Sequence, residues 1–334
     1  MGDVILTLPM ARVLKKCYPG AHVAMLIHSY TAELAGSDPD VDQVIQVESH
    51  TPSIARTVAE LRRSRFDVVF HTNPRPRFAL ITVLSGIPVR VGTGYRWYSF
   101  LFNRRVFEHR KDARRHELEY NLNLLHAIGC DAPWDDVRPR VVVDDAQTVR
   151  ARRALADAGV PEGAKLVIIH PGSGGSARDW SPRHFATLAS MLAAHDGLSV
   201  LMTGGKDEEP LVAGIRAVCP LTVRSIVGSL SIREYAALAK LASVFIANST
   251  GPLHVAAAVG TPVVGLYPQI RALSAARWGP YAGRKVVLTP KGFPEDCRKC
   301  DGARGSRCRC MDSITPADVY QAAMRLLGAE AAAA

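Results

Sequence analysis

The fold is decided by the stretch Val244-Phe245-Ile246-Ala247-Asn248-Ser249-Thr250-Gly251-Pro252-Leu253-His254. Its first four residues are apolar and predict a buried strand. Small polar residues then form a turn, and a proline follows that suits the first turn of a helix. A second apolar run, residues 263–266, comes after that helix. A strand, a helix and another strand in this order predict a parallel sheet. Because ligands bind beyond the carboxyl ends of such strands, the turn is a candidate binding site.

The same alternation of strands and helices continues on both sides of this stretch and predicts an α/β protein. We expect further strands at residues 22–27, 44–47, 67–71, 166–169 and 199–203, with an edge strand at 141–143. We expect helices at residues 8–17, 53–63, 116–128, 182–192, 235–241 and 316–328. A length of 334 residues suits two domains, which we place at 1–150 and 151–334. The last helix is expected to pack back toward the N-terminal domain.

Composition favours a globular protein outside the membrane. Apolar residues make up 48% of the chain and charged residues 22%. No apolar run of about 18 residues is present, so a membrane span is not expected. There is no secretory leader pattern either, and the cytoplasm is the expected location.

Positive charge is concentrated in one part of the first half. The formal net charge is +10. Ten cationic residues fall within one short stretch, namely Arg75, Arg77, Arg90, Arg96, Arg104, Arg105, Arg110, Lys111, Arg114 and Arg115. This stretch is either a solvated basic face or a dock for an anionic acceptor or a membrane surface. Aromatic residues make up only 7% and no nucleic-acid motif is recognised, so no nucleic-acid partner is expected.

The seven cysteines fall into two groups. Three are scattered and are expected to be inert thiols, namely Cys17, Cys130 and Cys219. Four are clustered, namely Cys297, Cys300, Cys308 and Cys310. Four thiolates in a short segment suit structural zinc or iron. Reduced thiols and a disulfide stay open as alternatives for this cluster.

Two further turns follow predicted strands in the second half. The first runs from His170 to Trp180 and contains Ser173, Gly174 and Arg178. Its glycines let backbone N–H groups approach an anion, and the arginine could bind a diphosphate. The second turn carries Glu208 and Glu209, whose carboxylates could accept hydrogen bonds from a ribose. An acidic first helical turn, which the helix dipole favours, is the alternative there.

Four motifs, in order along the chain, resemble glycosyltransferase family 9, the ADP-heptose:lipopolysaccharide heptosyltransferases. The first is Gly2-Asp3 with Pro9, and the second is Arg115-His116-Glu117 with Asn121 and Leu124-Leu125. The third is the turn that begins at His170, and the fourth is Ser249-Thr250-Gly251 with His254. The resemblance implies a GT-B fold, in which two Rossmann-like domains with parallel sheets face each other across a cleft. The N-terminal domain would bind the acceptor and the C-terminal domain a nucleotide-sugar.

The resemblance also assigns roles to individual residues. It implies an inverting transfer of a heptose from an ADP-sugar to a hydroxyl of a lipopolysaccharide core, with Asp3 as general base and no cofactor for the chemistry. The donor-binding positions would be Ser173, Gly174, Arg178, Glu208, Glu209, Leu230, Ser249, Thr250, Gly251 and His254. The acceptor is expected to be an anionic lipid-linked saccharide, which implies peripheral contact with the inner face of the bacterial inner membrane. Its expected contacts are Arg75, Arg77, Arg115 and His116.

The chain departs from the family pattern at three places. The family carries a strand before the Gly-Asp motif, whereas Met1 directly precedes Gly2 here, so the N-terminal domain is expected to lack its first strand. Either the true start lies upstream, which we favour, or this domain is degenerate. Some members have aspartate in place of Ser249, and lysine is usual in place of Arg178. These departures keep two alternatives open. One is a transferase of another nucleotide-sugar to a different glycan or protein, and the other is an inactive sugar-binding homologue.

Overall fold

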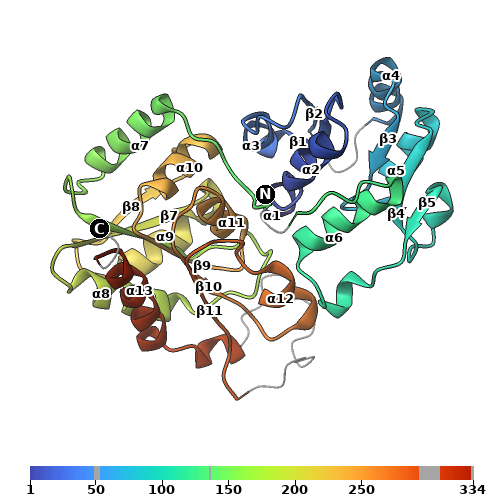
Figure 1. Ribbon diagram of the computed structural model, residues 1–334. Coiled ribbons are helices and arrows are strands. Elements are labelled where there is room, and N and C mark those ends of the chain that lie inside the picture. The colour runs from blue at the N-terminus through green and yellow to red at the C-terminus, as the bar shows by residue number, and fades with distance from the viewer. Residues whose placement is uncertain (49–52, 135–136, 293–308, 332–334) are drawn as a thin grey trace. The chain divides into compact units, whose positions relative to one another are not determined.

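The computed structural model describes residues 1–48, 53–134, 137–292 and 309–331. The chain forms two compact units (Figure 1). The N-terminal unit comprises Asp3–Pro139, and the C-terminal unit comprises Arg140–Ala334 together with Met1–Gly2. Each unit is described by itself.

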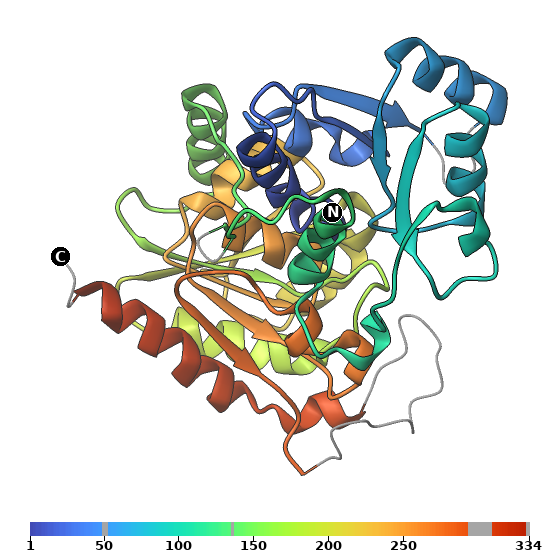
Figure 2. The same cartoon turned by 45° about the vertical axis from the view of Figure 1, so that its right-hand side comes forward.

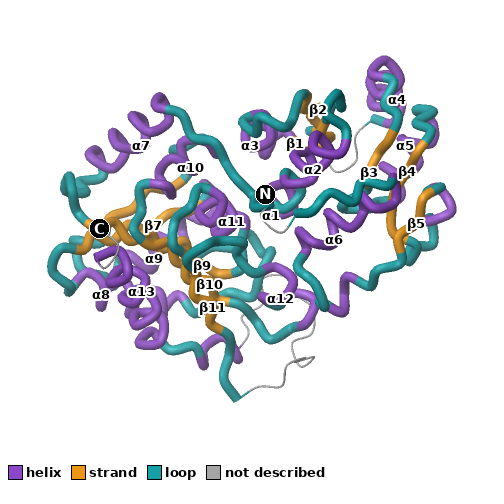
Figure 3. The backbone as a smooth tube through the Cα atoms, viewed as in Figure 1, coloured by secondary structure: helices purple, strands orange, loops and turns teal. Residues whose placement is uncertain are grey.

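A continuous sheet forms the centre of the C-terminal unit (Figure 3). Its six strands are all parallel, in the order β11-β10-β9-β6-β7-β8. Their bounds are β6 Lys165–His170, β7 Leu198–Gly204, β8 Arg224–Val227, β9 Val244–Asn248, β10 Val263–Leu266 and β11 Lys285–Leu288. All five residues of β9 are buried, as expected for a strand covered on both faces.

Helices cover both faces of this sheet. Those on one face are α8 Pro182–Ala193, α9 Glu209–Arg216 and α13 Pro316–Ala331, and those on the other are α7 Asp145–Asp157, α10 Ile232–Lys240 and α11 Gly251–Ala258. The strands alternate between these layers: Val244 and Ile246 face the first, and Phe245 and Ala247 the second. Helix α13 packs beside α8 (Figure 2). The remaining short elements are η5 Lys206–Glu208, η6 Arg271–Leu273, α12 Ala275–Trp278 and η7 Arg309–Ser313.

The N-terminal unit contains two separate parallel sheets among its described residues. One pairs β1 Ala24–His28 with β2 Gln43–Val47. The other has the order β3-β4-β5, with bounds β3 Val68–Phe70, β4 Val89–Thr93 and β5 Arg104–Val106. One apolar cluster contains Leu26 and Ile45 of the first sheet and Val69 of the second, so a common core joins them. The predicted loss of a first strand stays a prediction.

The helices of the N-terminal unit are short. Their bounds are α1 Gly2–Ile5, α2 Pro9–Cys17, η1 Ser29–Thr31, α3 Ala32–Gly36, α4 Ile54–Ser64, α5 Pro76–Leu84, η2 Ser99–Leu101, η3 Arg110–Asp112, α6 Glu117–Asn123 and η4 Leu124–Ile128. The single helix predicted at 116–128 is in fact two elements, the α-helix α6 followed directly by the 3-10 helix η4. The edge strand predicted at 141–143 does not form, because the N–H of Val141 bonds the carbonyl of Ala258 on helix α11 instead of a neighbouring strand.

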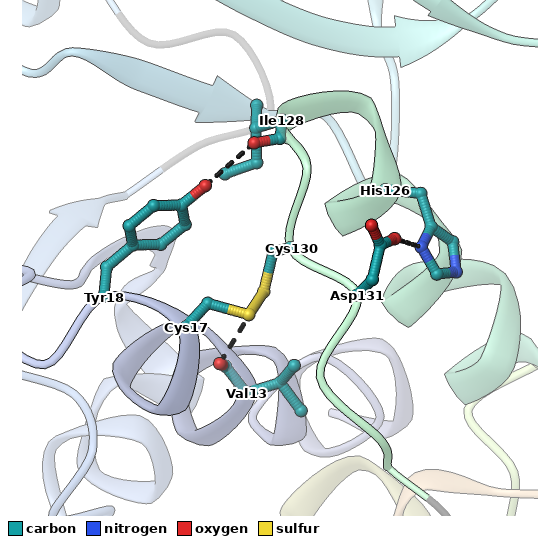
Figure 4. Close-up of a disulfide and its surroundings, with 7 residues drawn as sticks. All are labelled: Val13, Cys17, Tyr18, His126, Ile128, Cys130 and Asp131. Atoms are coloured by element: carbon teal, nitrogen blue, oxygen red, sulfur yellow. Dashed lines mark hydrogen bonds and ion pairs between the residues drawn. A yellow bond between two sulfur atoms is a disulfide. The ribbon is translucent and has the colours of Figure 1, made fainter.

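A disulfide joins Cys17 and Cys130 (Figure 4). The prediction that both are inert thiols was therefore wrong. The two residues are 113 positions apart in the sequence, but the packing of α2 against α6 brings their Cα atoms to 5.6 Å. The hydroxyl of Tyr18 donates a hydrogen bond of 2.8 Å to the carbonyl of Ile128 next to this link. Cys219, in contrast, is a reduced thiol whose pKa burial raises.

Candidate functional site

Polar side chains gather where β6, β7 and β9 end in the C-terminal unit. His170 is the last residue of β6 and Asn248 the last of β9. Thr203 lies one residue before the end of β7. All three residues are buried, with at most 4% of their surface exposed. Since β6 lies between β7 and β9, these groups meet at one edge of the sheet.

Asn248 fastens the Gly-rich loop, residues 171–181, to the end of β9. Its side-chain N–H₂ donates to the carbonyl of Pro171 at 2.8 Å and contacts Asp179 at 3.4 Å. Its Oδ1 accepts the N–H of Trp180 at 3.1 Å. The indole of Trp180 is buried and donates to Ile314 in the core. The loop is therefore fixed at both ends, although sequence reasoning did not include Asn248 among the site residues.

Glu208 lies against the middle of the same loop. Its carboxylate accepts the N–H groups of Gly174 at 3.2 Å and Gly205 at 2.8 Å. A Cβ at Gly172 would lie 2.0 Å from Glu208 Oε1, so only glycine lets the carboxylate approach this closely. Gly174 itself has a φ of +53°, in the left-handed region.

A buried polar network connects Glu208 to the sheet. His170 Nε2 lies 3.4 Å from Glu208, and its Nδ1 lies 3.0 Å from the Thr203 hydroxyl and 3.1 Å from that of Tyr235. Burial raises the pKa of Glu208, but His170 and the two glycine N–H groups outweigh it, so the pKa lies below its ordinary value. Burial raises the pKa of Tyr235, which stays protonated. Glu208 is thus a fixed anion near neutral pH.

The N-terminus of helix α11 faces the same edge of the sheet. Thr250 is its N-cap residue and is only 3% exposed. Its buried hydroxyl has no hydrogen-bond partner among the residues that the structure describes. A buried hydroxyl of this kind costs free energy unless a ligand or water satisfies it. Together with the unsatisfied N–H groups of a helix start, it suits an anionic ligand.

Met1 and Gly2 pack on this helix start. A Cβ at Gly251 would lie 2.7 Å from Met1 Cβ, and one at Gly2 would lie 2.9 Å from His254 Cδ2. His254 is buried, with 4% exposed. Two glycines therefore allow the close contact of the N-terminal residues with α11.

The other predicted donor residues differ in their surroundings. Arg178 is buried at 6% exposure beside Asp179, whose pKa is raised by burial and by the charge of Glu208. Ser249 lies next to the buried Tyr267, whose hydroxyl donates to the carbonyl of Trp278 at 2.7 Å. Glu209 is exposed at the start of α9, so Glu208 is the carboxylate that reaches the loop. Leu230 is half-buried against the core layer of α10 and α11, and Ser173 lies in the Gly-rich loop.

Asp3 lies in α1 and is exposed. The carbonyl of Asp3 accepts the hydroxyl of Thr7 at 2.7 Å. Asn121 donates to that hydroxyl at 3.3 Å and to the carbonyl of Leu6 at 3.2 Å. The motif residue Asn121 therefore holds the segment that carries Asp3.

Arg110 is half-buried at the centre of this part of the N-terminal unit. Its guanidinium pairs with Glu117 and bonds Asn121 at 2.9 Å and the carbonyl of Thr72 at 3.1 Å. Glu117 is only 5% exposed. Arg110 was counted within the basic stretch, but its charge is used inside the unit and not on a solvated face.

The predicted acceptor residues are placed at helix starts. Arg75 precedes α5 and is exposed, whereas Arg77 lies in its first turn and is half-buried. His116 caps α6, because its Nδ1 accepts the N–H of Leu118 at 3.2 Å. Arg115 is exposed and lies 3.9 Å from Glu108. His116 therefore has a structural task that its motif position did not reveal.

Three of the four clustered cysteines, Cys297, Cys300 and Cys308, lie outside the described residues. Cys310 is buried in the core layer beneath α13. Among the residues at 1–48, 53–134, 137–292 and 309–331, no group of three or more His, Cys, Asp or Glu side chains could hold a metal ion. Within the same ranges, no helix is both long and apolar enough to span a membrane.

Comparisons with known proteins agree with this architecture. Residues 54–302 match the family described as "Glycosyltransferase family 9 (heptosyltransferase)". A Haemophilus influenzae protein that carries only the general name of a glycosyltransferase is 29% identical over 287 residues, covering 84% of this chain and 83% of its own. Lipopolysaccharide heptosyltransferase 3 of Escherichia coli is 26% identical over 98% of this chain and 96% of its own.

A solved structure supports the fold. The structure of E. coli ADP-heptose lps heptosyltransferase II superposes with a TM-score of 0.80 at 22% identity, covering 98% of this chain and 96% of that one. The predicted GT-B class, with two units built on parallel sheets, is confirmed.

Proposed function

The chain belongs to glycosyltransferase family 9, and from this premise we propose that it transfers a heptose from ADP-heptose to a hydroxyl of a lipopolysaccharide core. The observation that carries the proposal is the buried Thr250 hydroxyl at the start of α11. Relatives named as lipopolysaccharide heptosyltransferases align over nearly the whole chain and support the substrate class.

We assign the donor diphosphate to the start of α11. Thr250 and the first N–H groups of the helix would bind its oxygens, and Arg178 would neutralise their charge. Gly251 and His254 would contact the sugar of the donor. The N–H of Gly174 already donates a hydrogen bond to Glu208. We therefore propose that Gly174 and Ser173 hold this carboxylate where it can accept hydrogen bonds from the ribose hydroxyls. Leu230 is proposed to contact the base, and Glu209 to remain in solvent.

The transfer is proposed as a single displacement. Asp3 takes the proton of the acceptor hydroxyl, whose oxygen attacks the anomeric carbon of the donor sugar. The bond from that carbon to the diphosphate oxygen breaks, and ADP leaves with the electron pair. Attack from the face opposite the leaving group inverts the anomeric configuration. The protein's own groups suffice, and no cofactor is proposed for the chemistry.

The acceptor is proposed to be anionic and lipid-linked. Arg75, Arg77 and Arg115 supply positive charge on the N-terminal unit, with His116 next to the last of them. Such an acceptor implies that the protein acts at the inner face of the bacterial inner membrane.

We also propose structural zinc or iron at Cys297, Cys300, Cys308 and Cys310. The observation in favour is that Cys310 is buried. A structural metal ion is enclosed by its protein ligands, whereas a catalytic one keeps one position open to water. Metal analysis of the purified protein tests this: one equivalent is expected, with loss in a Cys300→Ser variant. Equal metal content in both proteins would refute it.

Ser249 favours a second candidate, the transfer of a different nucleotide-linked sugar. Its hydroxyl carries no charge for a sugar contact, unlike the aspartate that some family members have at this position. Thermal shift with ADP-, UDP- and GDP-sugars, followed by a transfer assay, separates the two. ADP-heptose should stabilise the chain and be consumed. Stabilisation by a UDP-sugar, with no turnover of ADP-heptose, would replace the proposal by the second candidate.

A further inference from the structure

Large apolar side chains are exposed together in one part of the N-terminal unit. Among the described residues, every Trp or Phe whose side chain is more than half exposed lies here, namely Trp97 at 79%, Phe100 at 66% and Phe107 at 63%. Tyr95 is exposed at 45% and packs edge-on to Phe107, with 5.7 Å between the ring centroids. Exposed rings grouped in this way mark a site that contacts another surface.

The loop that carries these rings is built to hold them outward. Tyr98, directly after Trp97, and Phe102, two residues after Phe100, are buried, so the chain alternates between core and solvent. The Tyr98 hydroxyl donates to the carbonyl of Pro74 at 2.7 Å, and that of Ser99 donates to Thr93 at 2.7 Å. The exposed rings therefore project from an anchored turn.

Positive charge surrounds the same rings. Arg96, Arg104 and Arg105 are exposed, the last two on the edge strand β5. No Asp or Glu occurs from residue 68 to residue 107, a segment with six arginines. We name the exposed side chains of Tyr95, Arg96, Trp97, Phe100, Arg104, Arg105 and Phe107 the aromatic–basic surface.

We propose that the aromatic–basic surface docks on an anionic phospholipid bilayer. Trp and Tyr rings prefer the boundary between headgroups and acyl chains, and arginines attract anionic headgroups. Leu80 and Leu84 are exposed one turn apart on α5, the helix that packs against η2. Aliphatic side chains gain from contact with acyl chains but cannot stack on bases, so the surface fits a bilayer better than single-stranded nucleic acid.

This inference deepens the proposed function and rests on it, because a lipid-linked acceptor requires the protein to act at a membrane. Its test needs neither donor nor acceptor, so the two can fail separately. The purified chain is sedimented with vesicles of phosphatidylcholine alone and of phosphatidylcholine mixed with phosphatidylglycerol. Binding to the mixed vesicles is expected, with little binding to phosphatidylcholine and a marked loss at high salt.

Two double variants probe the two components. Trp97→Ser with Phe100→Ser, and Arg104→Glu with Arg105→Glu, should each weaken vesicle binding by about tenfold or more. Val218→Ser with Leu221→Ser removes two similarly exposed apolar side chains, at 72% and 88%, from the C-terminal unit and should leave vesicle binding unchanged. Transfer to a delipidated, soluble acceptor should be unaffected by Trp97→Ser with Phe100→Ser.

Three results would overturn the proposal. The first is vesicle binding that the Trp97 and Phe100 substitutions leave unchanged in a variant with a wild-type circular dichroism spectrum. The second is an equal loss of vesicle binding in the Val218 and Leu221 control. The third is tighter binding to a polyuridine oligonucleotide that the anionic vesicles cannot displace.

Discussion

The two units hold their parallel strands in different ways. In the C-terminal unit six strands form one sheet, and its central strand β9 is buried along its whole length. In the N-terminal unit the described strands form sheets of two and three, and β1 and β3 are only half-buried. The C-terminal unit is thus stabilised by its sheet, whereas the N-terminal unit relies on links outside the sheets. These links are the disulfide and the contacts of Arg110.

The same contrast extends to the candidate site residues. The C-terminal residues sit at the ends of buried strands and share hydrogen bonds. Asp3 is on a four-residue helix, and side chains hold this segment: Thr7 donates to the carbonyl of Asp3 and Asn121 to that of Leu6. We therefore expect donor binding to depend on one unit and proton transfer on the other.

The largest effect is expected from Asp3→Asn. This change keeps the size of the side chain and removes the proposed base, so kcat should fall by about 10²- to 10⁴-fold. ADP affinity should stay at the wild-type value, because the donor residues are all in the C-terminal unit. Steady-state kinetics and calorimetric ADP binding measure the two. Wild-type turnover in this variant would remove Asp3 from the mechanism.

Cys17→Ser should lower the stability of the N-terminal unit alone. The disulfide closes a loop of 113 residues, and losing such a link typically costs about 2–4 kcal/mol. In urea, hydrogen exchange should show the amides of β1 and β3 becoming unprotected earlier than in the wild type. The amides of β9 should be unchanged, whereas an equal shift in both units would contradict the contrast. Cys219→Ser is the matched control, since that thiol forms no disulfide.

Acid should weaken the N-terminal unit through His71. Burial lowers the pKa of this histidine to about 4, with the charge of Arg90 adding to the effect. Between about pH 6.5 and 4 the unfolded chain binds a proton that the folded chain does not, so stability falls as the pH drops. The loss across this window is on the order of 3 kcal/mol. A His71→Asn variant should have a flatter pH dependence of unfolding there, and an unchanged slope would disprove the assignment.

Arg178→Ala should weaken donor binding through the C-terminal unit. Loss of a charge-assisted contact to a diphosphate costs about 1.5–3 kcal/mol, or roughly 10- to 100-fold in ADP affinity. Arg178→Lys keeps the charge and should recover most of the binding, as lysine is the usual family residue. Thermal unfolding of both variants shows whether the fold is intact. Equal ADP affinity in Arg178→Ala and wild type would place the diphosphate elsewhere.

Sequence patterns predicted the C-terminal unit better than the N-terminal one for a physical reason. Buried parallel strands are continuous apolar runs, and glycines and caps mark their turns, so 244–247 and 263–266 were predicted within one residue. The roles of Asn248 and Arg110 were missed because each depends on tertiary contacts, which for Arg110 join Thr72, 38 positions away, to residues of α6. Asn248 bonds residues 77 and 68 positions away, and Cys17 pairs across 113. Neither composition nor local spacing carries such information.

The smallest effect is expected from a substitution of Thr7, which tests the positioning of Asp3 separately from the binding of the donor. Its hydroxyl bonds the Asp3 carbonyl and receives a hydrogen bond from Asn121. Thr7→Val keeps the shape and removes both bonds, and a loss of about 1 kcal/mol in the positioning of Asp3 should lower kcat by about fivefold. KM for the donor should not change, and Thr7→Ser should restore kcat. A merely structural role would instead lower the melting temperature and leave kcat of the folded fraction intact. These side-chain hydrogen bonds are what we expect to position Asp3, the proposed base.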